Sequence, residues 1–362
     1  PEGIAHFLEH KLFESEDGDA FTKYAETGAS ANAFTSFDRT CYLFSCSDKF
    51  EENLQILLDF VQSPYFTAAT VQKEQGIIGQ EIKMYDDSPG WRVMFNMLLA
   101  MYKNHPVRID IAGTVESIAE IDDKLLYECY NTFYNPSNMF ICIAGNVNTE
   151  KVLSQIESGI KNTEAKEITR IDSEEPDEIL NPYTEQSLSV AQPLFCLGFK
   201  ETVNEPERTV KEKICTSVLL EILAGDSSPL YKRLINEGLI NDEFQSEYFT
   251  GRGYACAMFS GESQNPKRVA EEIKAEIARL RADGIDKKLF SAVRAAMYGD
   301  SIRIFNSTET IAMQLVGCAM SDTGLFDEIK YLKTITADDV QKRLSLLCGD
   351  KAVLSVINPN GD

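Results

Sequence analysis

The chain has 362 residues, of which 43% are hydrophobic and 25% charged, and its formal net charge is −22. These proportions are those of a globular protein, and the length predicts two domains. The acidic excess argues against binding of nucleic acid, whose phosphates need basic side chains. The excess fits either attraction of basic peptides or solubility alone, and no run of residues is long and apolar enough to predict a membrane span.

The first predicted element carries a chemical motif, because His6 and His10 stand four residues apart with Glu9 between them. On a helix this spacing places both imidazoles on one face, one turn apart, with the carboxylate beside them. The order His-x-x-Glu-His inverts the His-Glu-x-x-His motif of zinc proteases. Two imidazoles and a carboxylate suit Zn²⁺, and an extra glutamate suits a general base. The alternative is an amphipathic helix with two solvated histidines.

A β-hairpin and an amphipathic helix are predicted next. Two stretches rich in β-branched and aromatic side chains, at about residues 29–36 and 39–46, are joined by Phe37 and Asp38. Apolar side chains then recur with helical spacing over residues 50–62. These patterns indicate a hairpin followed by a helix that buries one face.

A further helix is predicted over residues 71–87. Glu74 and Glu81 lie seven residues apart and therefore share a face, with Ile77 and Ile78 between them. Carboxylates that flank apolar side chains are drawn toward the interior, where they need a metal or a partner. The alternative is a solvated acidic face. Because a histidine pair lies nearby in the chain, we interpret this face as the source of a third metal ligand.

The rest of the chain predicts a second copy of the same α/β unit. A buried strand is predicted at residues 139–145, and a polar, proline-containing linker follows at residues 166–187. Strands, at 194–199 and 254–260, and helices then recur in the earlier order. We therefore expect homologous domains at residues 1–165 and 188–362. The second contains no histidine and is expected to lack a metal site.

The remaining histidine and the cysteines predict structural roles. His105 precedes a proline, which favours an extended loop and a structural rather than a substrate-binding role. Nine cysteines are scattered singly, without a Cys-x-x-Cys pair. This pattern is typical of reduced thiols in a cytoplasmic protein.

These motifs resemble those of the pitrilysin/insulinase family of zinc metallopeptidases. The His-x-x-Glu-His motif is followed by Glu74 and Glu81 with the family's spacing, as Glu-x6-Glu. The resemblance runs over nearly the whole chain and is greatest with the two-domain, processing-protease-like branch of bacteria. It also involves the segments 28–36, 105–106, 111–114, 134–138 and 228–234.

The resemblance implies a complete zinc site in the first domain. By motif position, His6, His10 and Glu81 match the zinc ligands of the family. Glu9 matches its general base, and Glu74 matches the acid that orients the site. One zinc ion per chain is therefore expected.

The resemblance also implies the fold and the substrate-binding strand. It predicts an α+β protein of two homologous domains, each a mostly antiparallel sheet covered by helices, which together form half of a clamshell. Asn32 and Ala33 are expected on an edge strand that pairs with the substrate backbone. The family places a strand before the motif helix, so we expect further residues before Pro1.

One departure from the family pattern bears on activity. In the resembled family the second half supplies an arginine and a tyrosine, seven residues apart, that hold the substrate carbonyl. Here Ile240 is the seventh residue after Arg233, and Asn241 stands where relatives often have tyrosine. We therefore expect a zinc-dependent endopeptidase or oligopeptidase subunit that acts as a homodimer or with a paralogous second subunit. The alternative is a non-proteolytic zinc-binding or peptide-binding subunit of such a complex.

Overall fold

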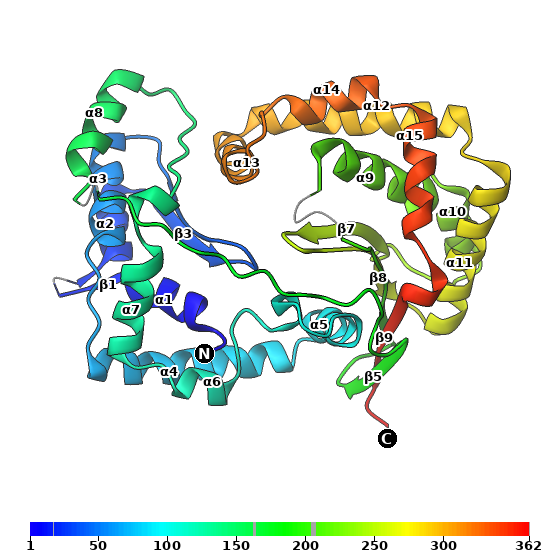
Figure 1. Ribbon diagram of the computed structural model, residues 1–362, viewed down its shortest axis with the longest axis horizontal. Helices are drawn as coiled ribbons and strands as arrows, with labels where there is room; N and C mark the ends of the chain where they lie inside the picture. Colours follow the sequence, from blue (N-terminus) through cyan, green and yellow to red (C-terminus); the bar gives the residue numbers. More distant parts are fainter. Residues whose placement is uncertain (17, 162–163, 204–207, 362) are drawn as a thin grey trace. The chain divides into compact units, whose positions relative to one another are not determined.

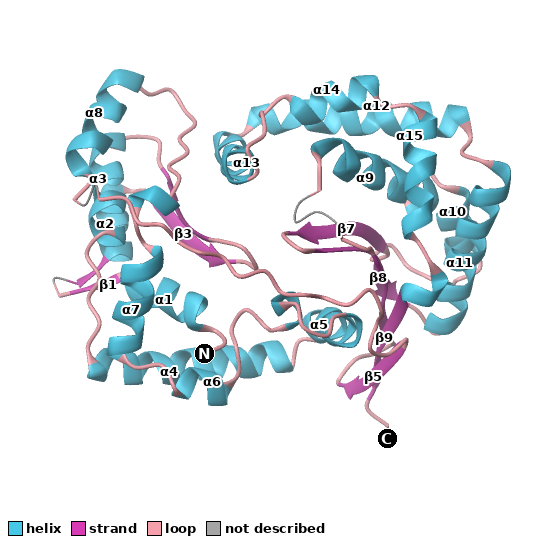
Figure 2. Cartoon of the chain, in the orientation of Figure 1, coloured by secondary structure: helices cyan, strands magenta, loops and turns pink. Residues whose placement is uncertain are grey.

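The computed structural model describes residues 1–16, 18–161, 164–203 and 208–361 (Figure 1). Helices and strands mix along the chain (Figure 2), which confirms the predicted α+β class. The chain forms two compact units that interleave along the sequence, so the sequential domain boundaries stay a prediction. Unit 1 comprises Pro1–Met84, Asp110–Ile171 and Ser307–Asp322, and unit 2 comprises Tyr85–Ile109, Asp172–Asn306 and Thr323–Asp362.

Unit 1 consists of helices around two short antiparallel hairpins. The hairpins are β1 with β2 and β3 with β4. The bounds of its elements are α1 Ile4–Leu12, β1 Glu14–Ser15, β2 Gly18–Asp19, α2 Ala20–Thr27, β3 Ser30–Thr35, β4 Thr40–Ser45, α3 Phe50–Val61, α4 Ala68–Asp86, α6 Val115–Ala119, α7 Asp123–Phe133, α8 Thr149–Gly159 and α13 Thr308–Met320.

The hairpin β3–β4 and helix α3 confirm the prediction for residues 29–62. Alternate residues of β4 face the helices, as the twofold side-chain period of a strand requires. Tyr42 packs edge-on against Phe60 of α3, with ring centroids 5.7 Å apart. Phe44 stacks on Tyr24 of α2 at 5.7 Å and also contacts Phe50. These aromatic contacts hold the β3–β4 hairpin against helices α2 and α3.

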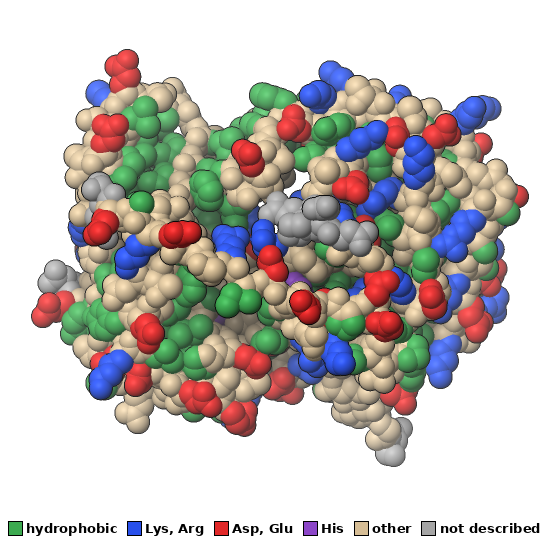
Figure 3. Space-filling model, in the orientation of Figure 1, with side chains coloured by type: hydrophobic (Ala, Val, Ile, Leu, Met, Phe, Trp, Pro, Cys, Tyr) green, Lys and Arg blue, Asp and Glu red, His purple; other side chains and the backbone are tan. Residues whose placement is uncertain are grey.

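The buried strand predicted at residues 139–145 is wrong. These residues adopt no regular structure, and Met139, Phe140 and Ile141 are exposed to 36%, 59% and 45%. Hydrophobic side chains are accordingly visible at the surface beside α3 and α8 (Figure 3). An apolar run becomes a strand only where another strand completes its hydrogen bonds. Among the described residues no strand pairs with this segment, although Ile143 packs against the buried cluster of Leu54, Leu58 and Val152.

Unit 2 is built on one five-stranded sheet of order β5-β9-β6-β8-β7. Only the β5–β9 pair is parallel, so the sheet is mostly antiparallel, as predicted. Strand β5 begins at Tyr183, inside the predicted linker. The strand bounds are β5 Tyr183–Leu188, β6 Leu194–Lys200, β7 Gln245–Gly251, β8 Tyr254–Glu262 and β9 Ala352–Pro359.

The core of unit 2 lies between this sheet and the helices packed on it. Helix α5 packs against β6 and β9, where Gly198 leaves room for Met97 and Met101. A Cβ at Gly198 would lie 2.5 Å from the Met97 sulfur, so a larger residue would force the ends of both methionine side chains to move. The helix bounds are α5 Pro89–Met101, α9 Val210–Ala224, α10 Pro229–Asn236, α11 Pro266–Asp283, α12 Lys287–Arg303, α14 Asp327–Thr334 and α15 Ala337–Lys342.

His105 is tied into unit 2 by both ring nitrogens. Its Nδ1 accepts a hydrogen bond from the Val107 N–H at 3.0 Å, so the ring proton lies on Nε2 and is donated to the Arg252 carbonyl at 3.0 Å. These contacts agree with the predicted structural role. None of the helices in the described ranges is long and apolar enough to cross a membrane.

Candidate metal centre

The two motif histidines project from helix α1, whose start is held by a close backbone contact. Gly3 precedes the helix with φ +85°, and its carbonyl accepts the Phe7 N–H at 2.9 Å. A Cβ on Gly3 would lie 2.4 Å from the Ala112 carbonyl oxygen. Only glycine fits such a left-handed position against another backbone. The loop at Ala112 and Gly113 therefore fixes where the motif helix begins.

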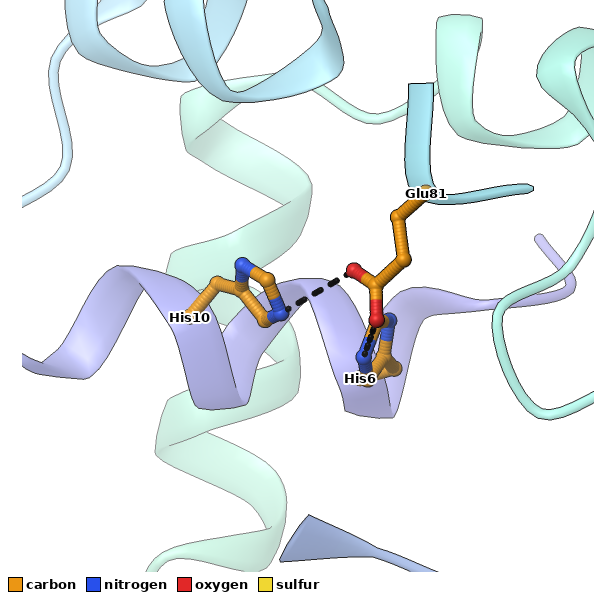
Figure 4. Close-up of side chains that lie close together, drawn as sticks. All are labelled: His6, His10 and Glu81. Carbon is orange, nitrogen blue, oxygen red and sulfur yellow. Dashed lines mark ion pairs between the residues drawn. The ribbon is translucent and has the colours of Figure 1, made fainter. Parts of the chain in front are cut away.

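Glu81 of α4 faces both histidines (Figure 4). The His6 Nε2 atom lies 3.7 Å from Glu81 Oε1, and the His10 Nε2 atom lies 3.5 Å from Glu81 Oε2. One ligand atom of each residue falls within 4.8 Å of the others. Zinc bonds of roughly 2.1 Å place tetrahedral ligands about 3.4 Å apart. The spacing and the two-nitrogen, one-carboxylate donor set therefore fit Zn²⁺.

Glu74 holds the second nitrogen of His10. Its Oε1 atom lies 3.1 Å from His10 Nδ1. Burial lowers the pKa of His10, but the Glu74 hydrogen bond and the nearby Glu81 charge outweigh burial, so the pKa is raised overall. Burial raises the pKa of Glu74, and the same hydrogen bond reverses that shift, so its pKa is lowered. The pair is therefore poised with Glu74 ionised and His10 Nδ1 carrying a proton.

Helix α4 presents both glutamates because a neighbouring side chain anchors it. The Gln75 side-chain NH₂ donates to the carbonyls of Ile118 and Ile121 at 3.3 and 3.0 Å. Of the two isoleucines expected between the glutamates on the buried face, Ile78 is fully buried, but Ile77 is 46% exposed. The prediction for Ile77 is wrong because the buried stripe of this helix is narrower than one full face.

Glu9 lies beside the histidines and is 7% exposed. Burial raises its pKa, and the hydroxyl of Thr35 works against burial by donating to Glu9 Oε2 at 2.5 Å. A buried carboxylate with a raised pKa is suited to take up a proton. Burial and the neighbouring His10 both lower the pKa of His6, and Glu81 opposes them, so the ring is kept neutral as a ligand must be.

Strand β3 has one edge free among the described residues, since only β4 pairs with it. At the hairpin end the Ser36 N–H donates to the Arg39 carbonyl, which makes this a hydrogen-bonded pair. Such pairs alternate along an antiparallel ladder, so the backbone groups of Ala33 point away from β4, toward the free edge. The Ala33 N–H donates a hydrogen bond to Asn32 Oδ1 at 2.9 Å.

In unit 2, the residues at the departure from the family pattern have partners of their own. Arg233 donates to Glu272 at 3.1 Å, and Asn241 donates to Glu262 at 2.8 Å.

The sequence did not reveal Thr35 and Gln75 as residues that support the site, because nothing in it indicates which hydroxyl or amide contacts the site. Thr35 and Glu9 are 26 positions apart, and their contact depends on the tertiary fold.

Family models match most of the chain. Residues 1–115 match "Insulinase (Peptidase family M16)", and residues 120–297 match "Peptidase M16 inactive domain". A Bacillus subtilis relative named "Uncharacterized zinc protease YmfH" is 44% identical over 346 residues, which cover 94% of this chain and 81% of that protein.

Solved structures agree with these matches. A structure described as a putative M16-like peptidase from Alicyclobacillus acidocaldarius has a TM-score of 0.95 at 36% identity, covering 99% of this chain and 87% of that one. A protease from Helicobacter pylori, 20% identical with a TM-score of 0.88 and coverage of 99% and 89%, shares the fold. With the inverted histidine motif and the facing glutamate in place, the chain belongs to peptidase family M16, the insulinase family.

Proposed function

We propose that this chain is a zinc-dependent peptidase subunit, an endopeptidase or oligopeptidase that hydrolyses peptides together with a second subunit. The observation that carries the proposal is the convergence of His6, His10 and Glu81, with Glu9 beside them. The naming of relatives as zinc proteases supports it. The convergence combines the ligands that zinc needs with the base that hydrolysis needs.

The side chains divide the chemistry between binding and proton transfer. When held by the two histidines and Glu81, Zn²⁺ would act as a Lewis acid toward the peptide carbonyl and the attacking water. Glu9 accepts the proton of that water as its oxygen adds to the carbonyl carbon. As the carbon–nitrogen bond breaks, Glu9 returns the proton to the leaving amine. Glu74 keeps His10 in the orientation that aims Nε2 at the metal.

The free edge of β3 is the proposed binding place for the peptide. Because the backbone groups of Ala33 point away from β4, an extended peptide can add there as a further strand. Main-chain hydrogen bonds recognise the peptide backbone rather than its side chains. This mode of binding predicts broad specificity, with Asn32 exchanging its contact to the Ala33 N–H when a peptide arrives.

The second subunit is inferred from what stands in place of the expected arginine–tyrosine pair. Ile240 is 6% exposed in unit 2, and Asn241 is hydrogen-bonded to Glu262. Arg233 is present, but neither the isoleucine nor the amide supplies the phenolic donor that completes the family pair and would help to stabilise a developing oxyanion. A paralogous subunit, or a second copy of this chain, is the proposed source of such donors.

The test is zinc analysis with cleavage of an unstructured fluorogenic peptide by the full-length protein, alone and together with a paralogous chain of the same family. Wild type should bind about one zinc and His10→Ala should lose it, whereas His105→Ala should keep it. Glu9→Gln should keep zinc but lose roughly 100- to 10,000-fold in turnover. Unchanged zinc in His10→Ala would overturn the ligand assignment, and full activity of a lone monomer would overturn the need for a second subunit.

A second candidate function rests on the same departure at Asn241. The chain then serves as a zinc-binding or peptide-binding subunit without hydrolytic activity of its own. Under this candidate the peptide still binds along β3, so its affinity should survive removal of zinc by a chelator. Peptide affinity that survives chelation, together with no cleavage in the presence of the paralogous chain, would favour this function over the first.

A further inference from the structure

Thr35 links the proposed substrate strand to the proposed general base. It is the last residue of β3, and its Oγ1 donates to Glu9 Oε2 on helix α1 at 2.5 Å. Hydrogen bonds to an ionised carboxylate are shorter and stronger than neutral ones. The contact engages one of the two oxygens of Glu9, which is 7% exposed and has several rotatable bonds. The other oxygen then has a defined direction.

The Thr35 hydroxyl is itself oriented by its cross-strand partner. Thr35 and Thr40 are paired in the β3–β4 register, and their Oγ1 atoms lie 3.2 Å apart. A hydroxyl has one hydrogen to donate, and that of Thr35 is committed to Glu9. Thr40 must therefore donate to Thr35. The result is a chain of two hydroxyls that points from the hairpin end to the carboxylate.

The place of Thr35 on β3 connects the two hydroxyls to the proposed peptide-binding edge. Thr35 and Ala33 are two residues apart on β3. Their side chains therefore lie on the same face of the strand, and their backbone groups point to the same edge. A peptide that adds along Ala33 therefore binds the same rigid segment that holds the base. The β-branched side chain of threonine restricts rotation about χ1, which fixes the hydroxyl more firmly than serine would.

We infer that Thr35 is a positioning residue for hydrolysis: its hydroxyl, set by Thr40, fixes the Glu9 carboxylate relative to a peptide bound along β3. This inference rests on the proposed function and adds a residue to it. Misplacement of a catalytic group by about 1 Å costs on the order of 100-fold in rate. Removal of the hydroxyl should therefore act on turnover, while peptide binding along the backbone of β3 is kept.

The first test measures the contact without any activity. Urea unfolding midpoints are compared for wild type, Thr35→Val, Glu9→Ala and the double variant, all free of zinc. Thr35→Val keeps the shape of threonine but leaves Glu9 Oε2 without its donor, so it should lower the midpoint in the wild-type background. In the Glu9→Ala background the drop should be clearly smaller, because only the contact between the Thr35 and Thr40 hydroxyls is then left to lose. An equal drop in both backgrounds would overturn the inference.

The second test measures the role, with the zinc-loaded full-length protein, the paralogous chain and an unstructured fluorogenic peptide. Thr35→Val should lower kcat roughly 10- to 100-fold with KM within about twofold and zinc content unchanged. Thr35→Ser should recover most of kcat, and Thr40→Val should lose less than Thr35→Val. Thr132→Val, an exposed threonine of the same unit, is the control and should match wild type.

The outcomes separate this inference from the proposed function. Wild-type kcat in Thr35→Val, beside an active wild type, overturns the positioning role alone and leaves the peptidase in place. A loss confined to KM, or no recovery in Thr35→Ser, also overturns it, because either result assigns Thr35 to binding or to packing. Wild-type protein that carries zinc yet cleaves no peptide with the paralogous chain overturns the proposed function and the inference with it.

Discussion

His10 Nδ1 lies 3.1 Å from Glu74 Oε1, and this contact decides which nitrogen of the ring faces Glu81. An ionised carboxylate can only accept, so the ring proton must lie on Nδ1. The Nε2 lone pair then points toward the space shared with His6 and Glu81. Glu74 thereby selects the tautomer that can bind a metal, although it need not touch the metal itself.

Replacement of Glu74 by glutamine tests this selection. Glu74→Gln keeps the size of the side chain but removes the charge and can present an NH₂ group to Nδ1. We expect zinc affinity to fall roughly 10- to 100-fold, as for other partners of metal-bound histidines. Competition with a chelating dye measures the affinity. The exposed Glu26 supplies a control, since Glu26→Gln should bind zinc as wild type does. Equal zinc affinities in the two variants would show that Glu74 does not contribute to zinc binding.

The close contact at the start of α1 predicts a strong effect of a small substitution. Gly3 and Gly28 both have left-handed backbone angles, with φ +85° and +75°, but of the two only Gly3 would bring an added Cβ against a backbone oxygen, at 2.4 Å. Gly28→Ala should cost about 1–2 kcal/mol from its backbone angle alone. Gly3→Ala should cost more and should also weaken zinc binding, because it displaces the helix that carries His6. Urea unfolding and zinc titration measure both, and equal costs for the two variants would contradict the steric argument.

The motif and the local elements could be predicted because their signals are local. The spacing of His6 and His10 determines a shared helix face, and the alternation around Phe37 determines a hairpin, whatever surrounds them. The lack of a strand at residues 139–145 could not be foreseen, since an apolar run shows a tendency to pair with another strand but does not indicate whether a partner strand lies beside it. The role of Thr35 is a third case, because it depends on a contact between residues 26 positions apart.

The buried ring of His105 predicts a pH-dependent stability of unit 2. Burial lowers its pKa below the ordinary 6.5, outweighing the Arg252 carbonyl, which favours the charged form. The unfolded chain therefore binds a proton at a higher pH than the folded chain does. The stabilisation from the neutral ring is full above about pH 6.5 and is lost as the pH falls toward the lowered folded value.

His105→Asn isolates this contribution. Asparagine keeps an acceptor for the Val107 N–H but does not titrate and loses the Nε2 contact to Arg252. We expect the variant to be less stable than wild type at pH 7 and to lose less stability between pH 7 and pH 5. Unfolding midpoints in urea at both values measure the difference. A parallel decline of the two proteins would rule out His105 as a source of the pH dependence.

The outward direction of the Ala33 backbone predicts that proline is tolerated there and not at the next residue. The Ala33 N–H points to the free edge, so Ala33→Pro removes no bond of the β3–β4 ladder. The N–H of Phe34, which forms a hydrogen-bonded pair with Cys41, points into the ladder. Phe34→Pro should therefore lower the unfolding midpoint far more than Ala33→Pro does.

Peptide binding should respond to Ala33→Pro even though the stability of the hairpin does not. The substitution removes one donor for a peptide strand, and a hydrogen bond contributes about 0.5–1.5 kcal/mol, so KM for an unstructured peptide should rise roughly 2- to 10-fold. Zinc content should not change, because the metal ligands lie on α1 and α4. A peptide methylated at successive backbone nitrogens gives an independent measure, since only methyl groups that face β3 should weaken binding. Unchanged KM in Ala33→Pro, in a protein that still binds zinc, would show that the substrate does not add along this edge.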